Sequence, residues 1–278
     1  MIEPLLADEQ FLANVRATRG HAGLHIWWLG QSGYLLHHEG RFALLDPYLS
    51  ESLTAKYANT DKPHARMTRR VVDPAALNFV HVVTSSHNHT DHLDAETIKP
   101  LMAANPKLKL IVPEANREFV AQRLGVPLNV PEGLEDGMSV KAGGFGFHGV
   151  PAAHERRDQD EAGRDRFMGY VVKAGRWNVY HAGDTVLYDG MVERLETMNI
   201  DVALLPINGR SPQRRVAGNL DGREAAQLAH MIGAGVVIPC HYEMFEFNTA
   251  SPDAFVRECE RLGQPYKVLR AGERCTIA

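Results

Sequence analysis

The segment His87-Asn88-His89-Thr90-Asp91-His92 constrains this chain most, because it places three imidazoles and one carboxylate within six residues. It follows residues 78–84, a mostly apolar run that predicts a strand buried on both faces. Side chains two residues apart in an extended segment point the same way, so His87 and His89 can bind one ion. As the chain then curls toward a helix, Asp91 and His92 project to a neighbouring point. The spacing of this 87–92 cluster therefore predicts a metal site with room for two ions about 3.5–4 Å apart.

Three further residues of ligand type follow predicted strands elsewhere in the chain. Because loops at strand ends assemble sites in layered folds, we expect these side chains to join the 87–92 cluster. Imidazoles and carboxylates suit Zn²⁺, Mn²⁺ or Fe²⁺ without any thiolate, and a carboxylate can bridge two ions. Each also has a structural alternative when taken singly: His154 as a loop histidine, Asp184 as a helix cap and His241 as a core histidine. They are His154 after residues 147–153, Asp184 after residues 177–182, and His241 after residues 236–240.

Strands and helices alternate along the chain, but tight turns join the first strands. This combination favours an α/β (α+β) fold of two mixed β-sheets with helices outside over a single parallel sheet. Pro100 is expected to kink or shorten the helix that contains it. The helices are predicted within 1–20 and over 94–104, 114–124, 187–198, 221–232 and 252–262. The strands are predicted over 24–29, 34–38, 42–46, 78–84, 108–112, 139–141, 145–151, 168–174, 177–182, 202–206, 235–240, 266–269 and 274–277.

The length and composition bound the organisation of the chain and its partners. The 278 residues predict a single domain over 1–278, because the most polar run, 155–166, is typical of a solvated loop rather than of a linker. The net charge of −4 and the lack of a basic stripe argue against nucleic acid as a partner. No apolar run approaches the roughly 18 residues of a membrane span, so no membrane partner is expected. The three cysteines fit no disulfide framework, so the cytoplasm is the expected location. A small-molecule substrate is the expected partner, and a homo-oligomer stays open.

A polar loop after the predicted strand 202–206 carries expected contacts to a small-molecule substrate. Arginine suits bidentate capture of a phosphate or a carboxylate. A tyrosine beside the last histidine is predicted to donate to a substrate oxygen, with packing as the alternative. The predicted substrate-binding residues are Asn208, Arg210 and Tyr242, and the roles of Arg210, Arg214 and Arg215 stay open between substrate contact and solvated loop.

The order of these residues resembles that in the metallo-β-lactamase-fold hydrolases. The matching motifs are His87-x-His89-x-Asp91-His92, then His154, then Gly183-Asp184-Thr185, then His241, with an early aspartate at Asp46 in Leu44-Leu45-Asp46-Pro47. The resemblance implies a four-layer αββα sandwich with the metals at one edge. Gln31 and Ser32 would then lie in a turn that faces the same edge.

The resemblance also implies how the ligands divide between two metal positions. The first position would be held by His87, His89 and His154, and the second by Asp91, His92 and His241, with Asp184 bridging. The expected cofactor is one or two divalent ions, Zn²⁺ or Mn²⁺, with Fe²⁺ as a further candidate.

Within that superfamily, two branches are similar to particular segments. Trp28-Leu29-Gly30-Gln31-Ser32-Gly33, Asp46-Pro47-Tyr48-Leu49-Ser50, Leu205-Pro206-Ile207-Asn208-Gly209-Arg210 and Ile238-Pro239-Cys240-His241-Tyr242 look like the L-ascorbate-6-phosphate lactonase-like branch. Residues 86–94 also look like the N-acyl-phosphatidylethanolamine phospholipase D branch. That second branch acts on lipid at a membrane, and no lipid-binding amphipathic helix is evident here, so the lactonase-like branch ranks first.

These resemblances imply a metal-dependent hydrolase that opens a small polar sugar lactone, phosphorylated or not. Asp91 is expected to be catalytic, both as a metal ligand and as the proton shuttle to the leaving oxygen. The alternative is a phosphodiesterase or phospholipase D-like hydrolase that uses the same centre. A non-catalytic metal-binding or nucleic-acid-processing module is a third interpretation. An oxygen- or nitric-oxide-reducing variant is disfavoured, because it needs a flavin domain and an acidic residue where Asn88 stands.

Overall fold

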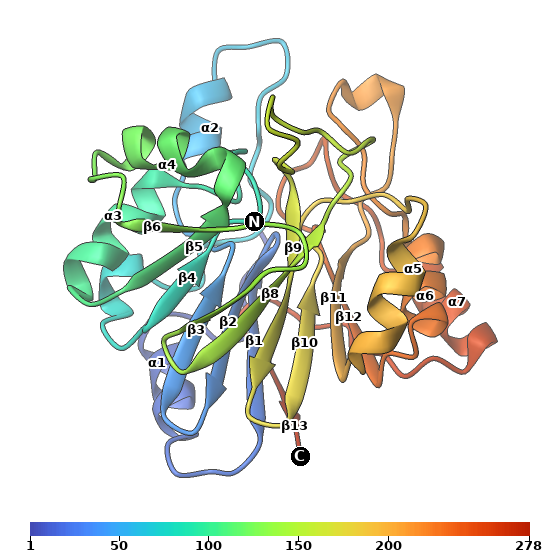
Figure 1. Ribbon diagram of the computed structural model, residues 1–278, viewed down its shortest axis with the longest axis horizontal. Coiled ribbons are helices and arrows are strands. Elements are labelled where there is room, and N and C mark those ends of the chain that lie inside the picture. Colours follow the sequence, from blue (N-terminus) through green and yellow to red (C-terminus); the bar gives the residue numbers. More distant parts are fainter.

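Two β-sheets pack face to face, with helices on both outer sides (Figure 1). The computed structural model describes residues 1–278. One large cluster of buried hydrophobic side chains draws on strands of both sheets, so the core lies between and around them. The predicted fold class, an α/β arrangement of two mixed sheets flanked by helices, is confirmed.

The first sheet is antiparallel at one side and parallel at the other. β13, β1, β2 and β3 pair antiparallel, whereas β3, β4, β5 and β6 pair parallel. The strands are β1 (Leu24–Gly30), β2 (Gly33–His38), β3 (Arg41–Leu45), β4 (Val82–Thr84), β5 (Lys109–Pro113), β6 (Pro131–Leu134) and β13 (Arg274–Ile277).

The second sheet has the same mixture. β7 to β10 pair antiparallel, and β10, β11 and β12 pair parallel. The strands are β7 (Ser139–Ala142), β8 (Phe145–Pro151), β9 (Met168–Ala174), β10 (Trp177–His181), β11 (Val202–Pro206) and β12 (Val236–Cys240). Parallel strands end at the same edge of a sheet, so the loops after β10, β11 and β12 meet there.

Helices cover the outer faces, and aspartate side chains begin two of them. Asp94 accepts from the backbone of α3, and Asp221 forms a capping box with Glu224 at the start of α6. No helix is both long and apolar enough to cross a lipid bilayer. On the side of the first sheet lie α1 (Asp8–Arg16), α3 (Ala95–Ala104) and α4 (Arg117–Leu124), whereas α2 (Ser52–Tyr57) lies beyond the strand ends at the top of Figure 1. On the side of the second sheet lie α5 (Met191–Leu195), α6 (Gly222–Met231) and α7 (Asp253–Leu262).

The structure corrects several element boundaries. The strand predicted over 266–269 is wrong, because that segment makes only one bridge, between Tyr266 and Val237. Pro100 does not end α3, which continues to Ala104 with Ile98 and Leu101 anchored in the core. β4 is shorter than predicted, because the chain before it turns and the backbone N–H of Val80 donates to the Asn105 side chain instead. Two short elements, α2 and β6, carry no periodic pattern and were not predicted.

His37, in β2, is a buried histidine far along the chain from the 87–92 cluster. Its ring stacks on Phe42 at 4.2 Å between centroids, and its Nε2 accepts from the backbone N–H of Gly40 at 3.1 Å. That contact leaves the proton on Nδ1, which lies 2.8 Å from the Thr18 hydroxyl. Burial, followed by the neighbouring His25 and His38, lowers the pKa of His37 to about 4. The folded protein therefore holds a neutral imidazole here.

This environment predicts an acid-dependent loss of stability. The folded pKa lies below the ordinary value of 6.5, so the unfolded chain binds more protons as pH falls. The contribution of His37 is fully present above pH 6.5 and is lost as the pH falls toward about 4. We expect His37→Gln to flatten the pH dependence of the urea-unfolding midpoint between pH 7 and 4.5. The exposed His230→Gln serves as the control; an unchanged slope in His37→Gln would contradict the assignment.

Candidate metal centre

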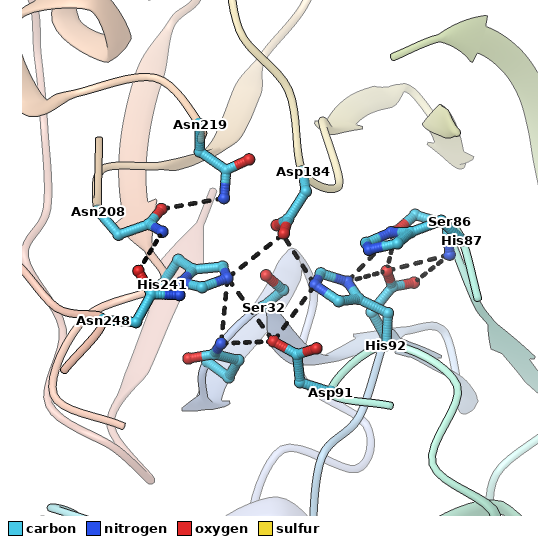
Figure 2. Close-up of polar contacts among 12 residues, drawn as sticks. Ser32, Ser86, His87, Asp91, His92, Asp184, Asn208, Asn219, His241 and Asn248 are labelled. Atoms are coloured by element: carbon cyan, nitrogen blue, oxygen red, sulfur yellow. Dashed lines mark hydrogen bonds and ion pairs between the residues drawn. The ribbon is translucent and has the colours of Figure 1, made fainter. Parts of the chain in front are cut away.

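The structure brings all seven predicted metal ligands to one edge of the sandwich. The 87–92 cluster forms the connection from β4 to α3, and the other ligands follow β8, β10 and β12. Figure 2 shows five of the seven: His87, Asp91, His92, Asp184 and His241. His241 adopts a left-handed backbone conformation, with φ of 64°, directly after β12. Its backbone N–H donates to the carbonyl of Gln31 at 3.0 Å, which joins the two sheets at this edge.

The ligand atoms form three overlapping groups, in each of which they lie within 4.8 Å of one another. Asp184 belongs to two groups, and its carboxylate points both ways: Oδ1 lies 3.3 Å from His92 Nε2, and Oδ2 lies 3.5 Å from His241 Nε2. This is the position that a bridging carboxylate needs. The groups are His87, His92 and Asp184; His89, His154 and Asp184; and Asp91, His92 and His241.

Unpartnered atoms test whether these residues fit a metal. His87 Nε2, His92 Nε2 and Asp184 Oδ1 are buried without a well-directed hydrogen bond. Buried polar atoms almost always have a partner, and imidazole nitrogens with carboxylate oxygens are ligands of Zn²⁺ and similar ions. The donor set therefore fits one or two divalent cations.

The electrostatics of the centre favour positive charge among these atoms. Burial, the largest influence on His87, lowers its pKa well below the ordinary value and keeps the imidazole neutral, as a metal ligand must be. Burial also opposes the charge of Asp184, but His92 and His241 outweigh it and hold its pKa well below the usual range. Burial opposes a charge on His92 too, yet Asp184 and Asp91 raise its pKa well above the ordinary value. The carboxylates of Asp91 and Asp184 therefore favour a bound cation among these atoms.

Asp46, directly after β3, organises the residues behind the ligands. Its buried carboxylate accepts from the Thr84 hydroxyl at 2.8 Å, from the Ser86 backbone at 3.1 Å and from His92 Nδ1 at 2.8 Å. Burial opposes its charge, but His181 and His92 outweigh burial and lower its pKa. By holding Nδ1 of His92, Asp46 directs Nε2 into the centre.

Two other ligands are oriented from behind. His154 Nδ1 lies 3.0 Å from the backbone carbonyl of Gly218, which leaves Nε2 directed at Asp184. Gln31 lies in the turn between β1 and β2, at the edge expected from the resemblance, and its Nε2 donates to Asp91 Oδ2 at 2.7 Å. The backbone of Gln31 has φ of 50°, and Trp28 Nε1 fixes its carbonyl at 2.9 Å.

A cavity of about 260 Å³ opens onto the centre. Five of the predicted ligands line it: His89, Asp91, His154, Asp184 and His241. The other walls come from α2 and the loop after it, from α4, and from two loops of the second half of the chain. Sequence reasoning missed these wall residues, because no motif marks them and only the fold brings them together: Lys56, Tyr57, His64, Arg123, Val216, Ala217, Phe245, Phe247 and Asn248.

The predicted substrate contacts lie outside this cavity wall. Arg210 pairs with Glu224 on the outer surface and lines a different hollow. Tyr242 stacks on Trp28 at 4.3 Å between centroids, and its hydroxyl donates to the backbone carbonyl of Leu269. Of the two proposed roles for Tyr242, its contacts are those of packing.

Asn208 is buried behind Asn248 and donates a hydrogen bond to its side chain. Asn248 lines the cavity, whereas Asn208 does not. The other two arginines of open role, Arg214 and Arg215, also have partners. Arg214 donates to backbone carbonyls and to Asn248, and Arg215 forms an exposed ion pair with Asp61 at 2.7 Å.

Comparison with known proteins places this site in a family. Residues 41–242 match the model of the beta-lactamase superfamily domain. A UPF0173 metal-dependent hydrolase from Methanoregula boonei is 32% identical over 242 residues, which cover 86% of this chain and 90% of that protein. A second one, from Methanopyrus kandleri, is 32% identical over 250 residues, which cover 88% and 96%. The chain therefore belongs to the UPF0173 metal-dependent hydrolases of the β-lactamase superfamily.

Solved structures agree with this assignment. Igni18, a novel metallo hydrolase from Ignicoccus hospitalis, has 25% sequence identity and a TM-score of 0.67, and the match covers 92% of this chain and 99% of that one. An isothiocyanate hydrolase from Delia radicum gut bacteria shares the fold, with a TM-score of 0.72 at 17% identity over 91% and 99% of the two chains. The match to Igni18 agrees with a metal-dependent hydrolase, and the match to the isothiocyanate hydrolase shows the shared fold.

The contacts of Asp46 predict the effect of replacing it. In Asp46→Asn one acceptor oxygen becomes an amide donor that faces other donors, so His92 loses its fixed orientation. We expect metal affinity to fall by roughly 10–100-fold, as for other groups that orient metal-bound histidines. The dissociation constant can be measured by competition with a chromophoric chelator. Asp73→Asn, at the exposed start of a short helical turn, is the matched control. Wild-type affinity in folded Asp46→Asn would contradict the role.

Proposed function

We propose that this metal-dependent hydrolase opens a small polar lactone, such as a sugar lactone, and that it accepts phosphorylated forms. The observation that carries the proposal is the small, polar cavity over the ligand cluster. Its volume of about 260 Å³ is slightly below the 300–1,000 Å³ typical of ligand pockets, which suits one sugar ring and not a lipid with two acyl chains.

The charges on the cavity wall support an acidic or phosphorylated substrate. Lys56 and Arg123 line the cavity, and neither forms an ion pair with a carboxylate. Arg123 Nη1 donates to the backbone carbonyls of Asn88 at 2.6 Å and Leu93 at 3.2 Å, which leaves Nε and Nη2 free. Two unpaired cations beside a metal centre favour an anionic group on the substrate.

A divalent ion held by the seven ligands would polarise the scissile carbonyl and make its bound water a nucleophile near neutral pH. The chain itself supplies the proton transfer. Asp91 faces the cavity with 17% of its side chain exposed, and Gln31 holds one of its carboxylate oxygens. In this position Asp91 can take a proton from the attacking water and deliver it to the leaving alkoxide.

A hydrolysis screen tests the substrate class. Protein purified without chelator, with its metal content measured, is assayed on glucono-δ-lactone, on 6-phosphoglucono-δ-lactone and on bis(p-nitrophenyl) phosphate. We expect turnover of the lactones, with a lower KM for the phosphorylated one because of Lys56 and Arg123. Turnover of the diester alone would replace the lactonase proposal with the phosphodiesterase alternative.

The proposed role of Asp91 predicts a separation between metal binding and turnover. Asp91→Asn keeps an oxygen ligand but cannot accept a proton, so we expect kcat to fall by at least about 100-fold, the lower range for general acid–base catalysis. Metal content at saturating metal concentration should stay near that of the wild type. Activity close to wild type in metal-replete Asp91→Asn would exclude the shuttle.

A further inference from the structure

Asn248 presents an unused hydrogen-bond donor to the cavity. It lies in the wall beside Val216 and Ala217. Its side-chain oxygen accepts from Asn208 Nδ2 at 3.0 Å and from Arg214 Nη1 at 3.3 Å. Its amide nitrogen makes no hydrogen bond within the protein and is not among the buried unpaired atoms. The donor is therefore available to a molecule in the cavity.

Neighbouring residues decide which end of the Asn248 amide faces the cavity. A guanidinium only donates, so the Asn248 atom facing Arg214 must be the oxygen. Asn208 then has to present its nitrogen to that oxygen, and its own oxygen accepts from Asn219 Nδ2 at 3.0 Å (Figure 2). The chain Arg214–Asn248–Asn208–Asn219 thus has one consistent polarity, which leaves the two N–H groups of Asn248 free.

Arg214 also fixes the position of this wall. It donates to the backbone carbonyl of Asn208, and its Nη2 donates to the carbonyl of Thr249 at 2.8 Å. These bonds tie the loop after β11 to the loop after β12. A donor held by such a network is preorganised, because little conformational freedom remains to be lost when a ligand binds.

We propose that Asn248 is a specificity-determining residue whose Nδ2 donates to a hydroxyl or other acceptor oxygen of a polyhydroxylated substrate. Arg214 and Asn208 are positioning residues that act through it. The inference rests on the proposed function, since it assumes a small polar substrate in this cavity. It also gives Asn208, whose predicted substrate contact the structure does not show, an indirect role in binding.

Two lactones that share a ring separate this role from a structural one. Glucono-δ-lactone and δ-valerolactone have the same six-membered ring, but only the first carries hydroxyls. Asn248→Asp keeps the acceptor for Asn208 and Arg214 and replaces the donor with an oxygen. We expect it to raise KM for glucono-δ-lactone roughly tenfold, as for a buried polar group left unpaired. KM for δ-valerolactone should stay within about twofold of wild type, and kcat within about threefold, since the ring carbonyl is bound elsewhere.

Four further variants complete the test. Asn248→Ala removes the donor without adding charge and should move KM for glucono-δ-lactone in the same direction. Arg214→Met should do so too, because Asn248 can then rotate, while Arg210→Met in the same loop should not. Asn78→Asp, an exposed change of the same chemistry remote from the cavity wall, is the control for Asn248→Asp. Equal changes in KM for both lactones, or no change, would overturn the proposal.

Binding of D-gluconate, measured by calorimetry on metal-loaded protein, separates this inference from the proposed function. If the wild type hydrolyses no lactone but binds gluconate, and the uncharged Asn248→Ala weakens that binding roughly tenfold, the lactonase proposal fails and the role of Asn248 stands. If the wild type hydrolyses glucono-δ-lactone and Asn248→Asp behaves like wild type, only the inference fails. If the wild type neither hydrolyses the lactone nor binds gluconate, both fail.

Discussion

The whole architecture depends on one electrostatic constraint: two carboxylates and several imidazoles are gathered at a single buried point. Asp91 and Asp184 lie close enough to repel each other, and His92 responds by favouring its charged form. Such an arrangement is stable only when positive charge lies among the carboxylates. A divalent cation held here would supply that charge and would also satisfy the unpartnered nitrogens of His87 and His92. Binding the metal and folding this edge of the sandwich are therefore coupled.

The sheets provide the rigid support that this constraint needs. Asp46 and the 87–92 cluster end neighbouring parallel strands of the first sheet, and Asp184 and His241 end parallel strands of the second. Every ligand thus sits where a strand stops and the backbone is free to turn. Asp46 connects the first sheet to the candidate metal ligands, because its carboxylate accepts hydrogen bonds from Thr84, from Ser86 and from the ring of His92.

Substrate recognition comes from less regular parts of the chain. The cavity wall combines α2, the loop after β11 and the loop after β12, which are joined by arginine side chains. Arg214 binds two loops of the second half together, and Arg215 reaches Asp61 in the first half. Loops generally carry the residues that contact a ligand, and a fold alone does not fix the function. In this protein the candidate ligands bear on the class of reaction, and the wall bears on the choice of substrate.

The 87–92 cluster, with His154, Asp184 and His241 at strand ends, was enough to predict the centre, because these ligands are dense in sequence or follow strands with clear patterns. Periodicity likewise predicted most strands and the long helices, whereas α2, β6 and the bridge at Tyr266 are short elements that tertiary contacts stabilise.

Asn208 and Arg210 show what residue type alone cannot place: both suit substrate binding, yet Asn208 is buried behind Asn248 and Arg210 pairs with Glu224. The sequence by itself determined which imidazoles and carboxylates are candidate metal ligands, and it determined the class, a metal-dependent hydrolase. Only the tertiary structure decided which side chains face the cavity, because the wall is assembled from loops distant in sequence.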